Sequence, residues 1–229
     1  MNHTTHQEGG EMRVLELHSG TESFSKVARE KGHETFTVDF DKQFDPDLCA
    51  DIREVTPDMI PFRPDVIWAS PPCTCFSVAS IGKHWHRDHS PKTEEAVAAL
   101  TVLHRTIKLI REINPVYYFL ENPRGKMRKL EIMNFAPRRV TVTYCQYGDT
   151  RMKPTDIWTN HLQWNPRPIC KNGDPCHISA PRGSSTGTQG LDKINAARVP
   201  SKLCSEIIAC CEMNHTTHQE GGVDDLRDM

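Results

Sequence analysis

The sequence predicts an α/β fold built on a mostly parallel sheet with helices on both faces. Short β-branched, apolar runs alternate along the chain with longer segments whose apolar residues recur every three or four positions. Such alternation is typical of parallel strands joined by crossover helices. A length of 229 residues allows one sizeable core and a small additional lobe.

The predicted elements follow one another in a regular order. Strand patterns occur at 13–17, 34–39, 64–69, 116–120, 140–144 and 156–159. Helical patterns with one apolar face occur at 22–31, 93–113 and 201–212. A loop-rich stretch runs from residue 160 to about residue 190.

Local signals mark where several of these elements begin and end. Gly20 marks a turn directly after the first strand. Pro71 and Pro72 end the central strand because proline offers no N–H to a neighbouring strand. Ser90 and Pro91 form a start signal ahead of the longest helix.

Charge and cysteine content restrict the class of protein. The net charge is −2, yet residues 122–200 hold 13 basic residues against 5 acidic ones. This asymmetry favours a face that lies on phosphates, with an ordinary solvated surface as the alternative. No apolar stretch approaches the roughly 20 residues of a membrane span, so we expect a soluble, cytoplasmic protein. Nine cysteines, an odd number in a chain of this size, are expected to be free thiols.

Four strand ends present polar groups at one predicted edge of the sheet. The Gly20 turn lets a ligand approach the backbone, and Asp39 after the second strand suits ribose hydroxyls, although a turn-stabilising role is an alternative. Cys73 follows the central strand as a candidate nucleophile, with a buried structural cysteine as its alternative. Glu121 closes the next strand. We therefore predict a nucleoside cofactor beside a reactive thiol.

Three segments carry a resemblance to a known family. Glu16-Leu17-His18-Ser19-Gly20-Thr21-Glu22-Ser23 is similar to the cofactor turn of DNA cytosine-5 methyltransferases, Pro71-Pro72-Cys73 with Phe76-Ser77 to their nucleophile motif, and Glu121-Asn122-Pro123 to their Glu-Asn-Val motif. The match covers roughly residues 13–160, with a weaker echo at 198–203. The compact size resembles that of small phage-type members. The resemblance implies an S-adenosylmethionine-dependent, Rossmann-like methyltransferase fold with a minimal target-recognition lobe.

The resemblance implies a division of the chain and a reaction. Residues 12–160 would form the catalytic domain, 161–195 a small basic target-recognition segment, and 196–212 the closing helix. Residues 1–10 recur unchanged as 213–222, so we expect polar tails at 1–11 and 213–229. The implied reaction transfers a methyl group from S-adenosylmethionine to C5 of a flipped-out cytosine in duplex DNA, through a covalent cysteine adduct.

The resemblance also implies roles for individual residues. The expected catalytic residues are Cys73, Glu121, Arg151 and Lys153, with no metal. The expected cofactor-binding residues are Leu17, His18, Ser19, Gly20, Thr21, Asp39, Phe40, Asp51, Ile52 and Pro71. The expected DNA-binding residues are Thr74, Ser77, Lys83, Trp85, Arg87, Arg167 and Arg182.

Several features depart from the family pattern or leave alternatives open. Thr74 stands where the family commonly has Gln, and the segment 81–89 is predicted to be a mobile loop in which Trp85 or a histidine fills the gap left by the base. Cys170, Cys176 and His177 suggest a zinc site with an unnamed fourth ligand, but free cysteines are the preferred interpretation.

The alternatives concern function as well. An RNA cytosine-5 methyltransferase shares the same motifs, and a non-catalytic DNA-binding relative would use the pocket only to sense the cofactor. The intact Cys73 and Glu121 argue against that second alternative. We expect a monomer acting in a bacterial host cell on DNA that contains cytosine, encoded by the host or by a phage.

Overall fold

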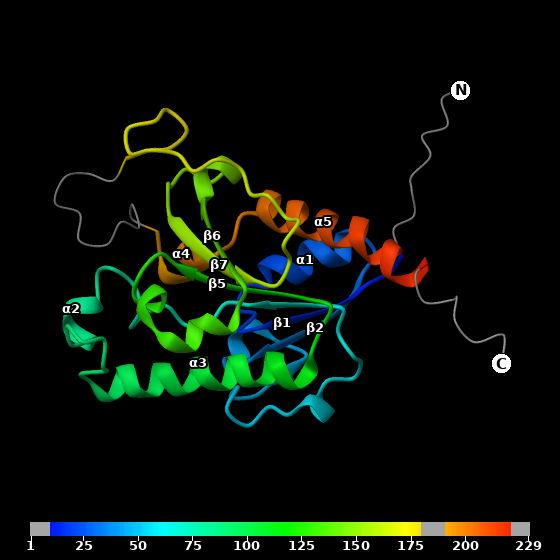
Figure 1. Ribbon diagram of the computed structural model, residues 1–229, viewed down its shortest axis with the longest axis horizontal. Helices are drawn as coiled ribbons and strands as arrows, with labels where there is room; N and C mark the ends of the chain where they lie inside the picture. Colours follow the sequence, from blue (N-terminus) through cyan, green and yellow to red (C-terminus); the bar gives the residue numbers. More distant parts are fainter. Residues whose placement is uncertain (1–9, 180–190, 221–229) are drawn as a thin grey trace.

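The computed structural model describes residues 10–179 and 191–220, with side chains to residue 214. It contains a seven-stranded sheet in the order β3-β2-β1-β4-β5-β7-β6 (Figure 1). The strands are β1 (Arg13–Leu17), β2 (Glu34–Asp39), β3 (Leu48–Cys49), β4 (Val66–Ala69), β5 (Tyr117–Pro123), β6 (Arg138–Thr143) and β7 (Pro154–Thr159). The first five are parallel, and β7 runs antiparallel to both neighbours. The predicted mostly parallel α/β fold is confirmed.

Helices cover both faces of the sheet. In Figure 1, α1 (Ser23–Glu30) and α5 (Ser201–Glu220) lie on one side, and α3 (Glu94–Ile113) lies on the other. The short helices are α2 (Ile81–His84) and α4 (Lys193–Ala197). Thr93 caps α3 by accepting a hydrogen bond from the N–H of Ala96, and Asn114 ends the helix in the left-handed conformation.

Two apolar clusters fill the spaces above and below the sheet. One cluster packs α3 against Leu15, Ile67 and Leu120, and the other packs α1 and α5 against Val14 and Phe119. All four residues of β4 are buried, because this central strand has a layer of helices on each face. The continuous apolar composition of the predicted central strand follows from this position.

Three differences between the observed and the predicted elements affect predicted features of the chain. β5 continues through Glu121 to Pro123, so the Glu-Asn-Pro motif lies within the strand and not after it. α5 extends to Glu220, past the predicted end at 212 and into the segment interpreted as a polar tail. The sequence 81–84, predicted to be a mobile loop, forms α2. Among the described residues, no helix has both the length and the apolar character needed to cross a membrane.

Candidate functional site

The turn between β1 and α1 has an unusual backbone. His18, Gly20 and Glu22 all adopt positive φ angles, of 57°, 48° and 56°. Only the glycine takes this conformation without strain, so the surrounding structure must hold the other two residues in place. Part of that support comes from Asp39 at the end of β2, whose carboxylate accepts a hydrogen bond from the Gly20 N–H at 2.8 Å. The predicted ribose-binding acid therefore also shapes the turn.

A cavity of about 370 Å³ opens beside this turn. It is lined by His18, Val38, Asp39, Phe40, Ala50, Asp51, Ile52, Arg53, Pro72, Ala98, Ala99 and Val102. The volume lies within the usual range of about 300–1,000 Å³ for small-molecule sites. Pro72 places one end of the cavity next to Cys73, and the small side chains of α3 form an apolar wall.

The predicted cofactor residues fall into two groups. His18, Asp39, Phe40, Asp51 and Ile52 line the cavity. The remaining five are not among its lining residues: Leu17, Ser19, Gly20, Thr21 and Pro71. Sequence reasoning missed the α3 wall, because a helix surface carries no local signal that a ligand lies against it.

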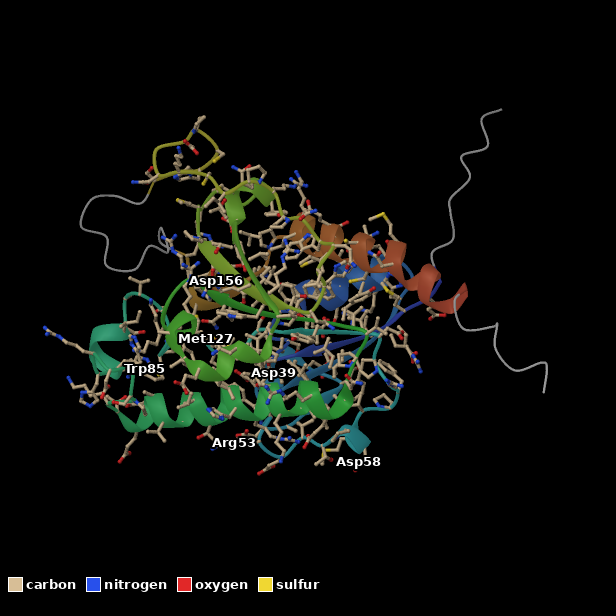
Figure 2. All side chains as sticks on the ribbon, in the orientation of Figure 1. Asp39, Arg53, Asp58, Trp85, Met127 and Asp156 are labelled. Carbon is tan, nitrogen blue, oxygen red and sulfur yellow. The ribbon has the colours of Figure 1, made fainter. Side chains whose placement is uncertain are left out.

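Two titratable groups of the cavity, His18 and Asp51, have shifted pKa values. Burial lowers the pKa of His18 to about 4, so its ring is neutral at physiological pH, and Nε2 lies 2.9 Å from the hydroxyl of Thr106. The guanidinium of Arg53 grips both oxygens of Asp51 and lowers the pKa of that carboxyl to about 2. Asp39 and Arg53 are labelled in Figure 2. The cavity is therefore lined by two carboxylates, the guanidinium paired with one of them, and a neutral imidazole.

The residues fit S-adenosylmethionine on independent grounds. Carboxylates at Asp39 and Asp51 are acceptors suited to ribose hydroxyls and an exocyclic amine, and the exposed ring of Phe40 offers an apolar face to a base. Within the described residues, the buried hydroxyl of Ser19 has no hydrogen-bond partner, which leaves a polar group of the turn free for a ligand.

Cys73 lies just beyond β4, in a segment tied to β5. The side-chain amide of Asn122 donates a hydrogen bond to the carbonyl of Pro71 at 2.8 Å. Asn122 is completely buried, so this bond fixes the backbone two residues before the thiol. Cys73 is exposed, as a nucleophile must be. The Pro-Pro-Cys and Glu-Asn motifs are therefore joined directly.

A second tie holds the chain after Cys73. The carbonyl of Phe76 accepts a hydrogen bond from the Lys126 N–H at 2.8 Å, and Ser77 forms a bridge with Gly125. A Cβ atom on Gly125 would lie 2.2 Å from the Phe76 oxygen, so only glycine permits this approach. Cys73 is thus held from both sides by the chain that follows Glu121.

Glu121 is buried on β5 within reach of a tyrosine and a lysine. The hydroxyl of Tyr144 donates to Glu121 Oε1 at 2.8 Å. Burial raises the pKa of Glu121, which favours the protonated carboxyl, while the positive charge of Lys153 acts in the opposite direction. Although Cys73 is exposed as a residue, the protein atoms around its sulfur partly desolvate the thiol and raise its pKa; the charge of Glu121 raises it further, and Lys153 lowers it. Cys73, Glu121 and Lys153 therefore form one electrostatically coupled group.

Arg151 and Lys153 occupy different positions around this group. Both donate hydrogen bonds to the carbonyl of Ala196 at the end of α4, at 3.1 and 2.9 Å. The guanidinium of Arg151 is buried and paired with Asp149, whereas Lys153 interacts with Glu121 and Cys73. Of the two predicted catalytic cations, Lys153 is the one that the structure brings to the thiol.

Trp85 lies in the interior of its segment. Its side chain is only 4% exposed, its indole N–H donates to the carbonyl of Cys75 at 2.7 Å, and its ring packs against Phe76. Figure 2 shows it next to α2. Trp85 therefore packs in the core of this segment, and its contact with DNA stays a prediction. Its position among polar residues gave no signal of this burial.

The other predicted DNA-binding residues lie in varied surroundings. Thr74, Lys83 and Arg87 are exposed, and Ser77 is partly buried with its hydroxyl 3.0 Å from that of Ser80. Their roles stay predictions.

Of the two predicted DNA-binding arginines of the basic segment, only Arg167 lies among the described residues. Arg167 donates to Glu206 and to the carbonyl of Gln146, and its guanidinium lies over the ring of Tyr147. It therefore fastens the segment to α5, and its contact with DNA stays a prediction. Arg182 lies outside the described residues.

Tyr144 is a site residue that sequence reasoning missed. It is fully buried, donates to Glu121, and its ring lies 4.5 Å from the ammonium of Lys153. In the sequence it appears only as the last residue of a predicted strand, where a buried aromatic residue is ordinary. The antiparallel pairing of β5 with β7, and of β7 with β6, is what brings it to the site.

Comparison with known proteins agrees with this geometry. The sequence model for "C-5 cytosine-specific DNA methylase" matches residues 12–133, the segment that contains the Gly20 turn, Cys73 and Glu121. A "Probable DNA (cytosine-5)-methyltransferase" of Frog virus 3 (isolate Goorha) is 31% identical over 221 residues, which cover 87% of this chain and the whole of the relative.

Solved structures show likeness at lower identity. The methyltransferase EhMeth of Entamoeba histolytica is 10% identical with a TM-score of 0.54, over 90% of this chain and 99% of that one. A mutant of Spodoptera frugiperda DNMT2 is 19% identical with a TM-score of 0.44, over 67% of this chain. The chain spans about half (52%) of that protein's length. The motifs, their juxtaposition and the sequence match together show that the chain belongs to the C-5 cytosine-specific DNA methylase family.

Proposed function

We propose that this chain methylates cytosine at C5 in duplex DNA, with Cys73 as the nucleophile and S-adenosylmethionine as the methyl donor. The observation that supports these roles best is the hydrogen bond between Asn122 and Pro71, because it joins the nucleophile segment to the strand that carries Glu121. Family membership supports the reaction class.

The cofactor would occupy the cavity beside the Gly20 turn. His18, Asp39, Phe40, Asp51 and Ile52 would hold it, and S-adenosylmethionine supplies, when bound, an electrophilic methyl group. Because Pro72 lines this cavity and Cys73 follows it, a cofactor bound there lies on the side of the thiol.

Cys73 and Glu121 would act together on the base. The Cys73 thiolate adds to C6 of cytosine, which moves the ring electrons so that C5 becomes nucleophilic and takes up the methyl group. Loss of the C5 proton and departure of the thiolate then restore the aromatic base. Glu121, whose protonated form burial favours, would share a proton with N3 and offset the charge that develops on the ring.

Lys153 and Tyr144 would tune this pair. Lys153 lowers the pKa of the Cys73 thiol and so increases the reactive thiolate fraction. Tyr144 holds the Glu121 carboxyl in one orientation. The target base can reach such a buried carboxyl only outside the helix stack, so the proposal includes base flipping.

The proposal is tested with a trapped adduct. Duplex DNA containing 5-fluorocytosine, incubated with the full chain and S-adenosylmethionine, should give a protein–DNA adduct that survives denaturation, because fluorine at C5 cannot leave as a proton does. Cys73→Ser should abolish the adduct and Cys75→Ser should retain it. The reverse result would overturn the assignment of the nucleophile.

A parallel reaction separates the alternatives. If tRNA that contains 5-fluorocytosine forms the adduct and duplex DNA does not, the chain is an RNA methyltransferase and the proposal is wrong. Cofactor binding without an adduct on either nucleic acid would favour a non-catalytic relative. Bisulfite sequencing of DNA from cells that express the chain should show protected cytosines, and the Cys73→Ser chain should show none.

A further inference from the structure

A cluster of thiols and one imidazole lies apart from the cofactor cavity and from Cys73. Cys145 lies in η5 (Tyr144–Tyr147), the short 3-10 helix after β6, and the other members come from the segment that follows β7. These are Cys170, Cys176 and His177. Their four potential ligand atoms all lie within 4.8 Å of one another. We propose that Cys145, Cys170, Cys176 and His177 bind one structural Zn²⁺ ion.

The separations between these atoms suit tetrahedral coordination. A zinc ion with Zn–S bonds of about 2.3 Å and a Zn–N bond of about 2.0 Å separates its ligands by about 3.5–3.8 Å. The sulfurs of Cys145 and Cys176 are 3.6 Å apart, and His177 Nδ1 lies 3.7 Å from Cys170 and 3.6 Å from Cys176. The sulfurs of Cys145 and Cys170, at 3.1 Å, need to separate slightly around an ion.

The donor set and its surroundings point to the same metal. Three thiolates and one imidazole form a closed set of soft ligands, which is typical of structural zinc and leaves no position for a catalytic water. Gln146 directs its side-chain amide at the sulfur of Cys176 from 3.4 Å, a donor suited to a metal-bound thiolate. The sequence offered only three of the ligands, because Cys145 lies 25 residues before Cys170.

Trp164 and Arg167 tie the start of the segment after β7 to the rest of the protein, but the part that supplies three of the ligands has no regular secondary structure. Within the described chain, residues 160–179 contain no helix or strand, and both Ile169 and Ile178 are more than half exposed. A segment without a core of its own is commonly held by a metal. Because Cys145 directly follows Tyr144, the ion would also fix the short helix that carries the partner of Glu121.

Metal analysis of the full chain tests the proposal. Protein purified under reducing conditions without chelator should contain about one zinc per chain, and Cys145→Ser and His177→Ala should lose it. His177→Cys should retain zinc, because it restores a fourth soft ligand. Cys210→Ser, on α5 and outside the cluster, is the matched control and should also retain it.

Cobalt substitution and mass analysis complete the test. Co²⁺ should give the visible bands of a tetrahedral ion with thiolate charge transfer, and these should vanish in Cys145→Ser. Zinc content equal in the wild-type chain and in Cys145→Ser would assign the metal to other groups, such as the terminal histidines, and overturn the proposal. A disulfide between Cys145 and Cys170 in the reduced, freshly purified protein would overturn it as well.

Discussion

The side-chain amide of Asn122 donates a hydrogen bond to the carbonyl of Pro71 at 2.8 Å and so connects the two most diagnostic motifs of the chain. The motifs lie about fifty residues apart in sequence, at the ends of neighbouring parallel strands β4 and β5. Since Glu121 precedes Asn122 and Cys73 follows Pro71 by two residues, one bond sets the position of the thiol relative to the carboxyl.

Asn122→Ala should impair the reaction more than it impairs the fold. The substitution leaves a carbonyl without its donor in a buried position, at a cost of about 1–3 kcal/mol in the free energy of unfolding. It also frees the nucleophile segment, so the rate of adduct formation with fluorocytosine DNA should fall at a temperature where the protein remains folded. Denaturant unfolding and adduct kinetics measure the two effects separately.

Asn160→Ala is the matched control. Asn160 makes comparable side-chain bonds to Val116 and Tyr118, near the other end of β5 and away from the thiol. It should lower stability to a similar extent and leave the adduct rate unchanged. Equal rates in the two variants would show that Asn122 acts only on stability.

Phe40→Ala should weaken cofactor binding with little change in stability. The Phe40 side chain lines the cavity yet is 66% exposed, so the fold does not depend on its burial. Loss of an aromatic contact of about 0.5–1.5 kcal/mol corresponds to an affinity for S-adenosylmethionine that is roughly two- to twelvefold weaker. Calorimetric titration measures this affinity. Met59 is also an exposed apolar residue but lies outside the cavity, so the Met59→Ala chain should bind S-adenosylmethionine normally. Unchanged affinity in Phe40→Ala would place the base elsewhere.

The fold and part of the cavity lining could be predicted because their signals are local. The apolar run at 64–69 is itself a visible strand pattern. The turn at Gly20 and the acid at Asp39 each lie at the end of another such strand. Parallel topology then brings the strand ends to one edge. The motif resemblance added Cys73 and Glu121 to the same edge.

The remaining parts depend on pairing that the sequence does not display. Tyr144 reaches Glu121 only through the antiparallel placement of β7 between β5 and β6. The sequence suggests that Trp85 is a surface residue because its neighbours in the chain are polar. In the structure its ring packs on Phe76. Such contacts between distant segments decide burial, and local composition does not reveal them.

His18 should make stability depend on pH below neutrality. Burial lowers its pKa from 6.5 to about 4, so the unfolded chain binds the proton more readily than the folded chain. Above about pH 6.5 the ring is neutral in both states, and His18 makes no pH-dependent contribution to stability. As the pH falls from there toward 4, the free energy of unfolding decreases by up to about 3 kcal/mol. Relative to His18→Gln, which does not titrate, the wild-type chain should lose stability more steeply across this window. Parallel curves from urea unfolding would contradict the assignment.

Lys153→Gln should make Cys73 less reactive without removing the hydrogen bond to Ala196, because the amide still offers a donor. The pKa of the thiol is already raised by burial and by Glu121, and the positive charge of Lys153 is what opposes this rise. Without that charge the thiol ionises at higher pH, so alkylation of Cys73 by iodoacetamide should be slower at every pH below its midpoint.

Lys83→Gln provides the comparison for this last prediction. Lys83 is exposed, and its charge lowers the pKa of the Cys75 thiol. It is not among the groups that shift the pKa of Cys73. Peptide mapping after alkylation at a series of pH values separates the two cysteines. The Lys153 variant should move the profile of Cys73 to higher pH, and the Lys83 variant should leave that profile in place. If both variants moved it equally, a general loss of positive charge would account for the change, and Lys153 would have no specific part in activating the nucleophile.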